Sequence, residues 1–309
     1  MAHFTNPLAT PSQLYHQTSF SSLPRDLLEV VFLSTQCLTQ AAGLLLDLPQ
    51  SVTAQANVLL ARYWLVDSPM AYEFTDASAA ALLIASKVGP LSFTLKDMAN
   101  VYGYLLSKES NFLRPGYEAT NDAKAYYQSD ADVHAFHTRL LAMEARMLYA
   151  LGFDAQVALP HHLAVTYIQT LELVGVTKRE AAMRAFHYLN TALLSPQMLY
   201  LTHQPHALAT AAIYNAAKDL GAKTPGCEWW EVFDVDREEL GFLVVGMRSV
   251  QTLLVQRKEE MPHLLEGVVT RRMIEEEMGK RGLAVADASE VVDEESAVMR
   301  RMDEQAGVN

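Results

Sequence analysis

Two histidines in the middle of the chain have a spacing that could serve metal chemistry. His134 and His137 lie three residues apart beside Asp130 and Asp132, and imidazole and carboxylate groups on one helix face can hold a divalent cation. The sequence favours a simpler interpretation, in which these are polar residues at the solvated start of a helix. We therefore expect no metal there.

Two further groups of residues could by type and spacing take part in chemistry, but their surroundings explain them in other ways. His203 and His206 flank a proline at a helix start, where capping and loop hydrogen bonds account for them without a ligand. Glu260 and His263 have the spacing of half a carboxylate-bridged di-iron motif, but Pro262 breaks the helix and no second copy exists. The motifs GxGxxG, GxxxxGK[ST], HExxH and GxSxG are also missing. We expect no catalytic residue and no cofactor.

The composition is that of a folded, acidic protein. Its 309 residues are 50% apolar, which suffices for two ordinary domains. The formal net charge is −12 and no basic run exceeds two residues, whereas a nucleic-acid-binding protein needs clustered Lys and Arg. Two cysteines cannot form a disulfide framework, and the chain shows no signal peptide and no long apolar run. We expect a soluble, intracellular protein that binds neither a membrane nor nucleic acid directly.

Apolar residues recur at helical spacing from residue 26 onwards, and no segment is typical of a strand. The sequence predicts five helices before residue 154, at 26–46, 51–66, 77–88, 95–106 and 132–151, with a polar loop at 107–131. It predicts five more after residue 160, at 161–174, 179–193, 206–220, 228–233 and 236–256. The predicted fold class is therefore all-α.

The third helix of each set has the composition of a helix that is buried on every side. The first of these follows Asp76 as a candidate N-cap and stays apolar until Lys87. AALLIASK at 80–87 aligns with AAIYNAAK at 211–218, with three alanines and the final lysine shared. This repeat predicts two tandem five-helix folds. The expected boundaries are an N-terminal extension at 1–25 that docks as an arm, a first fold at 26–154, a second fold at 155–256 and a charged tail at 257–309.

The tail is the most acidic part of the chain. Residues 257–309 carry 8 basic and 13 acidic side chains. The segment LLEGVVTRRMIEEEMGK at 264–280 has some helical spacing, so it folds as a solvated helix or not at all. The last 25 residues have the composition of a disordered segment.

Tandem five-helix units with a buried, alanine-rich third helix ending in lysine resemble the cyclin fold. LIASK at 83–87 is similar to the end of the third cyclin-box helix, and AMEARMLYALGFD at 142–154 is similar to the fifth. The segments at 40–65, 100–106 and 159–173 resemble L-type cyclins, especially fungal ones, in order and spacing. The resemblance covers about residues 5–256. The Arg-Ser repeats of longer L-type cyclins do not occur, so no direct contact with splicing factors is carried over.

The resemblance implies a kinase-binding face. Lys87 and Glu144 would form its polar centre and meet backbone groups of a kinase C-helix, while Val88, Leu148 and Phe153 would supply apolar surface around them. The alternative is that Lys87 and Glu144 only pair with each other at the bundle surface. Val88 stands where many cyclins continue with acidic residues, so part of the usual rim contact is missing.

The function implied by the resemblance is that of a non-enzymatic regulatory subunit. It would bind and activate a cyclin-dependent kinase of the PITSLRE type, in a nuclear heterodimer linked to RNA polymerase II transcription and pre-mRNA splicing. One alternative is a transcription-elongation cyclin of the T, K or C type. A transcription factor of the TFIIB type also has two cyclin-like folds, but its zinc ribbon and basic face are absent from this sequence.

Overall fold

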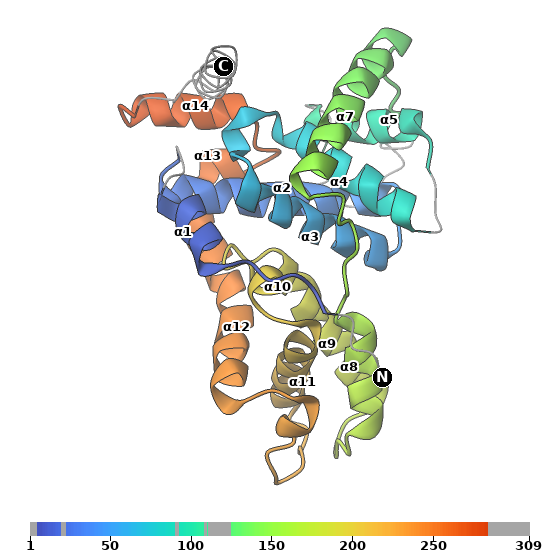
Figure 1. Cartoon of the computed structure of the whole chain (residues 1–309), viewed down its shortest axis with the longest axis vertical. Helices are drawn as coiled ribbons and strands as arrows, with labels where there is room; N and C mark the ends of the chain where they lie inside the picture. Colours follow the sequence, from blue (N-terminus) through green and yellow to red (C-terminus); the bar gives the residue numbers. More distant parts are fainter. Residues whose placement is uncertain (1–4, 20–22, 90–92, 108–109, 111–124, 284–309) are drawn as a thin grey trace, which may run out of the picture.

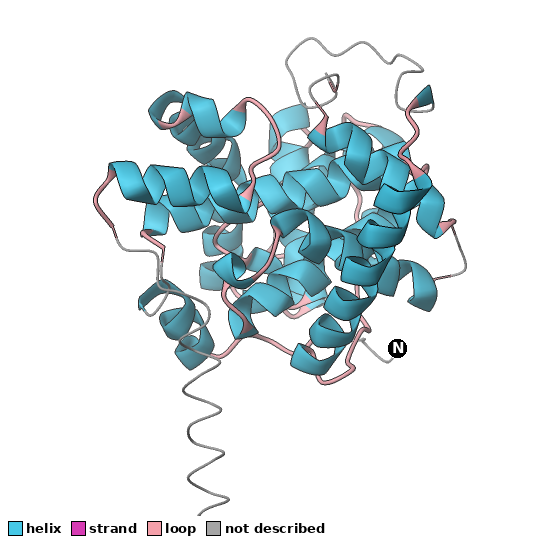
Figure 2. Ribbon diagram, turned by 90° about the horizontal axis from the view of Figure 1, so that it is seen from above, coloured by secondary structure: helices cyan, strands magenta, loops and turns pink. Residues whose placement is uncertain are grey.

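The computed structural model describes residues 5–19, 23–89, 93–107, 110 and 125–283. Within these ranges the chain is helical, and the only β-type pairing is one isolated bridge between Val174 and Lys223. The all-α prediction is confirmed. Figure 1 shows the helices in two groups, with α2 to α7 above and α8 to α12 below. Figure 2 shows the same chain from above, with helices joined by loops.

The first group is built around a helix with no polar face. The group consists of α2 (Arg25–Leu45), α3 (Gln50–Val66), α4 (Phe74–Val88), α5 (Leu95–Leu106) and α7 (Asp130–Ala150). Every residue of α4 from Phe74 to Ser86 is buried, and its small side chains let α2, α3 and α7 approach closely. The central, buried position predicted for this helix is therefore observed.

The start of α4 differs from the prediction. The predicted N-cap, Asp76, is wrong: α4 begins at Phe74, whose fully buried ring extends the apolar surface by one turn. Asp76 instead accepts a hydrogen bond from Arg139 Nε at 3.0 Å.

By length and composition α2 could cross a membrane, but 72% of its most apolar stretch is buried against other helices, which is the position of a core helix.

The second group has one helix fewer at full length than the sequence suggests. Its elements are α8 (His161–Thr170), α9 (Lys178–Leu193), the short α10 (Leu199–Thr202), α11 (Pro205–Leu220), the 3-10 turn η2 (Glu231–Phe233) and α12 (Arg237–Glu260). The helix predicted at 228–233 is only η2, because Asp234 adopts a left-handed φ of 59° and a right-handed helix cannot continue through it. As predicted, α11 is the buried helix of this group.

The N-terminal extension docks across both groups and also forms a helix. Helix α1 (Pro11–Ser19) lies against α3. Before it, Ala9 N donates to Leu201 O at 2.8 Å, and Asn6 Nδ2 donates to Ala158 O at 2.9 Å. Arg62 on α3 donates to Asn6 Oδ1 at 3.4 Å. The extension therefore connects the two groups as an arm, and α3 also contacts α9 and α10 directly.

The segment after residue 256 is more ordered than a solvated tail. Helix α12 continues to Glu260, and residues 261–283, here called the C-terminal segment, form α13 (Pro262–Leu265), which contacts α2, and α14 (Arg271–Lys280). Arg257 pairs with Glu29 at 2.7 Å and Arg281 pairs with Asp26 at 2.6 Å. The boundary predicted at 257 thus divides a continuous helix. The disorder predicted for the last 25 residues lies outside the described residues.

An ion-pair network joins three helices of the second group. Asp219 on α11 accepts hydrogen bonds from Arg184 on α9, Arg248 on α12 and the Tyr188 hydroxyl, each at 2.6 Å. Burial by itself would raise the pKa of Asp219. The hydrogen bonds from Tyr188 and the two arginines outweigh it and lower that pKa to about 2.

We expect Asp219→Asn to lower the free energy of unfolding by about 1 to 2 kcal/mol at neutral pH, because the carboxylate is stabilised more in the folded than in the unfolded chain. The folded-state pKa lies below its ordinary value of 3.8. The stabilisation is therefore complete above that pH and is lost as the pH falls through about 2. Urea unfolding of both proteins between pH 7 and pH 2 measures this, and a deficit that does not shrink on acidification would contradict it.

Candidate functional site

The predicted polar centre of the site is assembled from two helices. Lys87 lies in the last turn of α4, where a cation interacts favourably with the helix dipole. Glu144 lies in α7, between the buried Met143 and Met147. Lys87 Nζ donates to Glu144 Oε1 at 2.5 Å. The structure therefore brings together two residues that are 57 positions apart in sequence.

The two partners of this ion pair differ in exposure. The Lys87 side chain is 56% exposed, whereas the Glu144 side chain is only 10% exposed. Pairing within the chain, one of the two interpretations open at the sequence level, is thus observed. It does not exhaust the ammonium group, which has three N–H donors, and a single hydrogen bond to Glu144 occupies one of them. The remaining donors sit on an exposed side chain and can meet acceptors of a partner.

Two of the three predicted apolar residues, Val88 at the end of α4 and Phe153 just after α7, are exposed to solvent. Val88 is 52% exposed and Phe153 is 71% exposed, while Leu148 is half-buried and packs on the core. Phe153 has a φ of 60°, directly after Gly152 at 58°. This left-handed turn ends α7 and is closed by Phe153 N donating to Leu148 O at 2.8 Å. A phenylalanine rarely adopts this backbone region, and here the result is a ring held away from the core.

The exposed apolar surface extends beyond the predicted residues. Leu141 is 49% exposed and lies one and two turns from Glu144 and Leu148, so that all three share one face of α7. Tyr149 is 82% exposed on the same helix. Neither residue was predicted. The helical spacing of Leu141, Glu144 and Leu148 is the signal in the sequence that would have found the first.

A cavity of about 590 Å³ opens beside Val88. Its walls come from α3, the end of α4, the linker between the helical groups, the start of α8 and the N-terminal arm. They are lined by Thr5, Asn6, Pro7, Gln55, Val88, Asp154, Gln156, Val157, Ala158, Leu159 and His162. The site is therefore an exposed ion pair with apolar neighbours, and a concave surface continues from it toward the second group.

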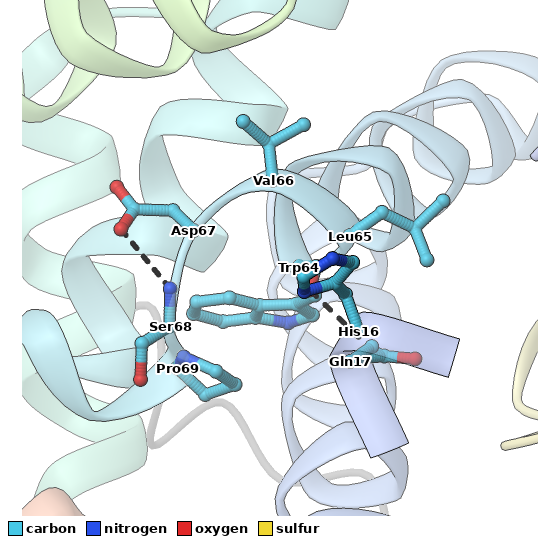
Figure 3. Close-up of a pocket in the computed structure, with 8 residues that line it drawn as sticks. All are labelled: His16, Gln17, Trp64, Leu65, Val66, Asp67, Ser68 and Pro69. Atoms are coloured by element: carbon cyan, nitrogen blue, oxygen red, sulfur yellow. Dashed lines mark hydrogen bonds between the residues drawn. The ribbon is translucent and has the colours of Figure 1, made fainter. Parts of the chain in front are cut away.

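A second, smaller cavity has no convergent chemical groups. It holds about 160 Å³ between α1 and the end of α3 (Figure 3). Gln17 donates to Trp64 O at 3.5 Å across it, and Asp67 Oδ1 accepts from Ser68 N at 3.0 Å. Pockets for small molecules are usually about 300 Å³ or larger. This cavity is smaller than that range.

The residues with possible metal chemistry do not converge. Among the residues that the structure describes, no group of three His, Cys, Asp or Glu side chains is placed to hold a metal ion. His263 pairs with Glu277 at 3.1 Å, and Glu260 pairs with Arg257. His203 stacks on Phe242. Each of these side chains has a structural partner.

Comparison with known sequences finds cyclin-L proteins among the relatives of this chain. No protein-family model matches it. It is 32% identical over 206 residues to an uncharacterized cyclin-L1-like protein of Schizosaccharomyces pombe, which covers 66% of this chain and 76% of the relative. It is 28% identical over 236 residues to cyclin-L2 of Homo sapiens, which covers 76% of this chain and 42% of the relative. The chain thus spans most of the yeast relative and less than half of the human one.

Solved structures share the fold at low sequence identity. A chain of the yeast RNA polymerase II CTD kinase CTDK-1 complex aligns with a TM-score of 0.61 and 14% identity, over 79% of this chain and 72% of that one. A chain of the CAK complex of Chaetomium thermophilum aligns with a TM-score of 0.57 and 16% identity, over 98% and 91%. The two helical groups thus have the all-α cyclin-box fold. The 32% identity to the yeast relative, of which 76% is covered, places the chain in the L-type cyclin family.

Proposed function

We propose that this chain is the regulatory subunit of a cyclin-dependent kinase and binds it through the face centred on Lys87 and Glu144. The observation that carries the proposal is the exposed end of Lys87, held in place by the mostly buried Glu144 and flanked by the exposed Val88 and Phe153. Membership of the L-type cyclin family supports it. No residue of the chain is given a catalytic role.

The activity of a kinase depends on the position of one of its helices, the C-helix. Phosphoryl transfer requires the kinase's strand lysine to pair with a glutamate on its C-helix, so the position of that helix decides activity. The ends of a helix carry backbone groups without intrahelical partners. The ammonium of Lys87 can donate hydrogen bonds to such carbonyl groups, while Val88 and Phe153 bury apolar surface against the kinase helix. A C-helix held in this way completes the kinase site without contact between this chain and ATP.

The ion pair between Lys87 and Glu144 prepares the surface for this contact. Lysine loses about 2 kcal/mol of rotamer freedom when it is fixed. Glu144 restricts Lys87 before the partner arrives, so part of that cost is already met in the free chain. The pairing within the chain and the contact with a kinase are therefore compatible.

The family also suggests the kinase and its setting. We extend the proposal to a kinase of the PITSLRE type, acting in the nucleus on transcription by RNA polymerase II and on pre-mRNA splicing. The names of the relatives support an L-type cyclin, and the choice of kinase rests on what the resemblance to L-type cyclins implies. The chain of the yeast RNA polymerase II CTD kinase complex supports the fold alone.

Affinity capture tests the proposal. The immobilised chain is incubated with cell extract, and bound proteins are identified by mass spectrometry beside Phe153→Asp, which places a charge on the proposed face at a 71% exposed position. We expect one cyclin-dependent kinase to be enriched by the wild type and lost with the variant. A matched control is Val232→Asp, at an 80% exposed position in the second group.

The identity of the captured kinase decides the finer proposal. A PITSLRE-type kinase agrees with it, whereas a transcription-elongation kinase would move the chain to the T, K or C type of partner. Capture of no kinase, or equal capture by Phe153→Asp, would contradict the proposed face. Binding of DNA that weakens with salt would instead favour a transcription factor.

A further inference from the structure

A polar pocket lies on the second group, on helices that take no part in the proposed kinase face. It holds about 370 Å³ and is formed by α9, α11 and α12. Arg184 from α9 and Arg248 from α12 both line it, together with His187 and Gln251. Asp219 and Tyr188 lie between the two arginines.

The two guanidinium groups of this pocket are held in fixed positions. Arg184 donates from Nε and Nη2 to Asp219, and Arg248 donates from Nε to Asn215 Oδ1 at 2.6 Å and from Nη2 to Asp219. Both also lie over the ring of Tyr188, with Cζ at 5.4 Å and 5.6 Å from its centre. A group fixed before binding loses less entropy when a ligand arrives.

The same groups still have donors to offer. The hydrogen bonds of Arg184 and Arg248 within the described chain use Nε and Nη2, which leaves both Nη1 groups available. Their side chains are 43% and 39% exposed. Two guanidinium charges face one carboxylate, so the pocket keeps one positive charge on a chain whose net charge is −12.

We propose that this pocket binds the phosphate group of a phosphorylated serine or threonine on a partner protein. A phosphomonoester carries about −1.5 to −2 charge at neutral pH and three strong acceptor oxygens. Guanidinium groups match phosphate because their N–H donors form a rigid fork. The pocket offers hydrogen-bond donors from two arginines on different helices, with His187 and Gln251 near them. These donors are more than the two oxygens of a carboxylate ligand can use. The pocket volume of about 370 Å³ also leaves room for a side chain next to the phosphorylated residue of the partner.

The test uses the full chain and a degenerate peptide library with one central phosphoserine, compared with the same library carrying serine or glutamate. We expect the wild type to retain the phosphorylated library at least tenfold better than either control, and Arg184→Gln to lose this preference. Arg184→Lys, which keeps the charge but not the fork, should recover only part of it. Arg237→Gln is the matched control, since Arg237 is an exposed arginine of α12 that does not line the pocket.

A second measurement keeps the test independent of peptide sequence and of folding. Titration with inorganic phosphate should shift the Nε–Hε NMR signals of Arg184 and Arg248 in a saturable way, and circular dichroism should show Arg184→Gln to be folded. Binding of inorganic phosphate as tightly as of the phosphoserine library would overturn the assignment to a protein partner. Equal retention of the phosphorylated and unmodified libraries, or unchanged preference in Arg184→Gln, would overturn the site.

Discussion

Exchange of the two charges in Lys87→Glu/Glu144→Lys should abolish binding of the cyclin-dependent kinase while the chain stays folded. The ion pair joins α4 to α7, and the double variant can re-form it with reversed polarity. A kinase carbonyl would then meet a carboxylate at the position where the proposed interface places the Lys87 ammonium. Truncation of a charged anchor in such an interface costs about 2 to 5 kcal/mol, which is roughly 30- to 4,000-fold in affinity, and a reversed charge should cost more.

The control for this exchange is a second ion pair in the same helical group. Lys96 and Asp130 are 3.7 Å apart between α5 and α7, and both side chains are largely exposed. Lys96→Asp/Asp130→Lys should leave kinase affinity and stability nearly unchanged, because exposed pairs contribute about 0 to 1 kcal/mol. Affinity is measured by titration calorimetry with the captured kinase. Unchanged affinity in the Lys87–Glu144 exchange would mean that this pair only joins the two helices.

Ile274→Asp should cause the largest loss of stability among the changes considered. Ile274 is fully buried where α14 packs on the first group, with Met261, Leu264, Val269 and Met278 also buried in the C-terminal segment. A carboxylate there loses the apolar packing and has no cationic partner prepared for it, which costs about 3 to 5 kcal/mol. Urea unfolding gives the loss in free energy of unfolding.

Hydrogen exchange shows where that loss occurs. If the C-terminal segment detaches as a unit, the amides of residues 261–283 and those of α2 beneath them should lose protection first. Arg272→Asp is the control, because Arg272 lies on the same helix with its side chain 84% exposed, and it should change stability by less than about 0.5 kcal/mol. Similar stability of Ile274→Asp and wild type would show that the C-terminal segment does not contribute to the fold.

The sequence predicts most of the first group because its helices are long and their apolar patterns are strong. The central helix is the clearest case, since only burial on every side explains ten successive residues without a charge between Asp76 and Lys87. The start of that helix is less certain from sequence. Asp76 is a good N-cap by residue type, but burial of Phe74 decides the start.

The second group and the tail show where local patterns fail. Residues 228–233 contain two tryptophans and a phenylalanine, and such an apolar run fits a short helix as well as a turn that packs its rings. Trp229 is buried and Phe233 stacks on Tyr167 at 3.9 Å, so tertiary contacts fix the turn. In the tail, helical spacing at 264–280 is visible, but its partner α2 lies more than two hundred residues away in sequence.

The candidate site follows the same division. The resemblance identifies Lys87 and Glu144, and the structure brings them to 2.5 Å. The exposed fraction of Phe153 depends on how α7 ends and was not predictable. Phe153 is presented to solvent by two successive residues with positive φ, and in sequence only Gly152 hints at such a turn.

Activation of a kinase by this chain is tested most directly by measuring the activity of the captured kinase with and without the chain. Purified kinase is assayed for phosphate transfer to a peptide substrate alone, with the wild type, and with Lys87→Glu/Glu144→Lys. We expect the rate of phosphate transfer to rise at least about tenfold with the wild type, equivalent to 1.4 kcal/mol of barrier, and little or not at all with the double variant. Equal kinase activity in all three reactions would contradict the assignment of this L-type cyclin as an activating subunit.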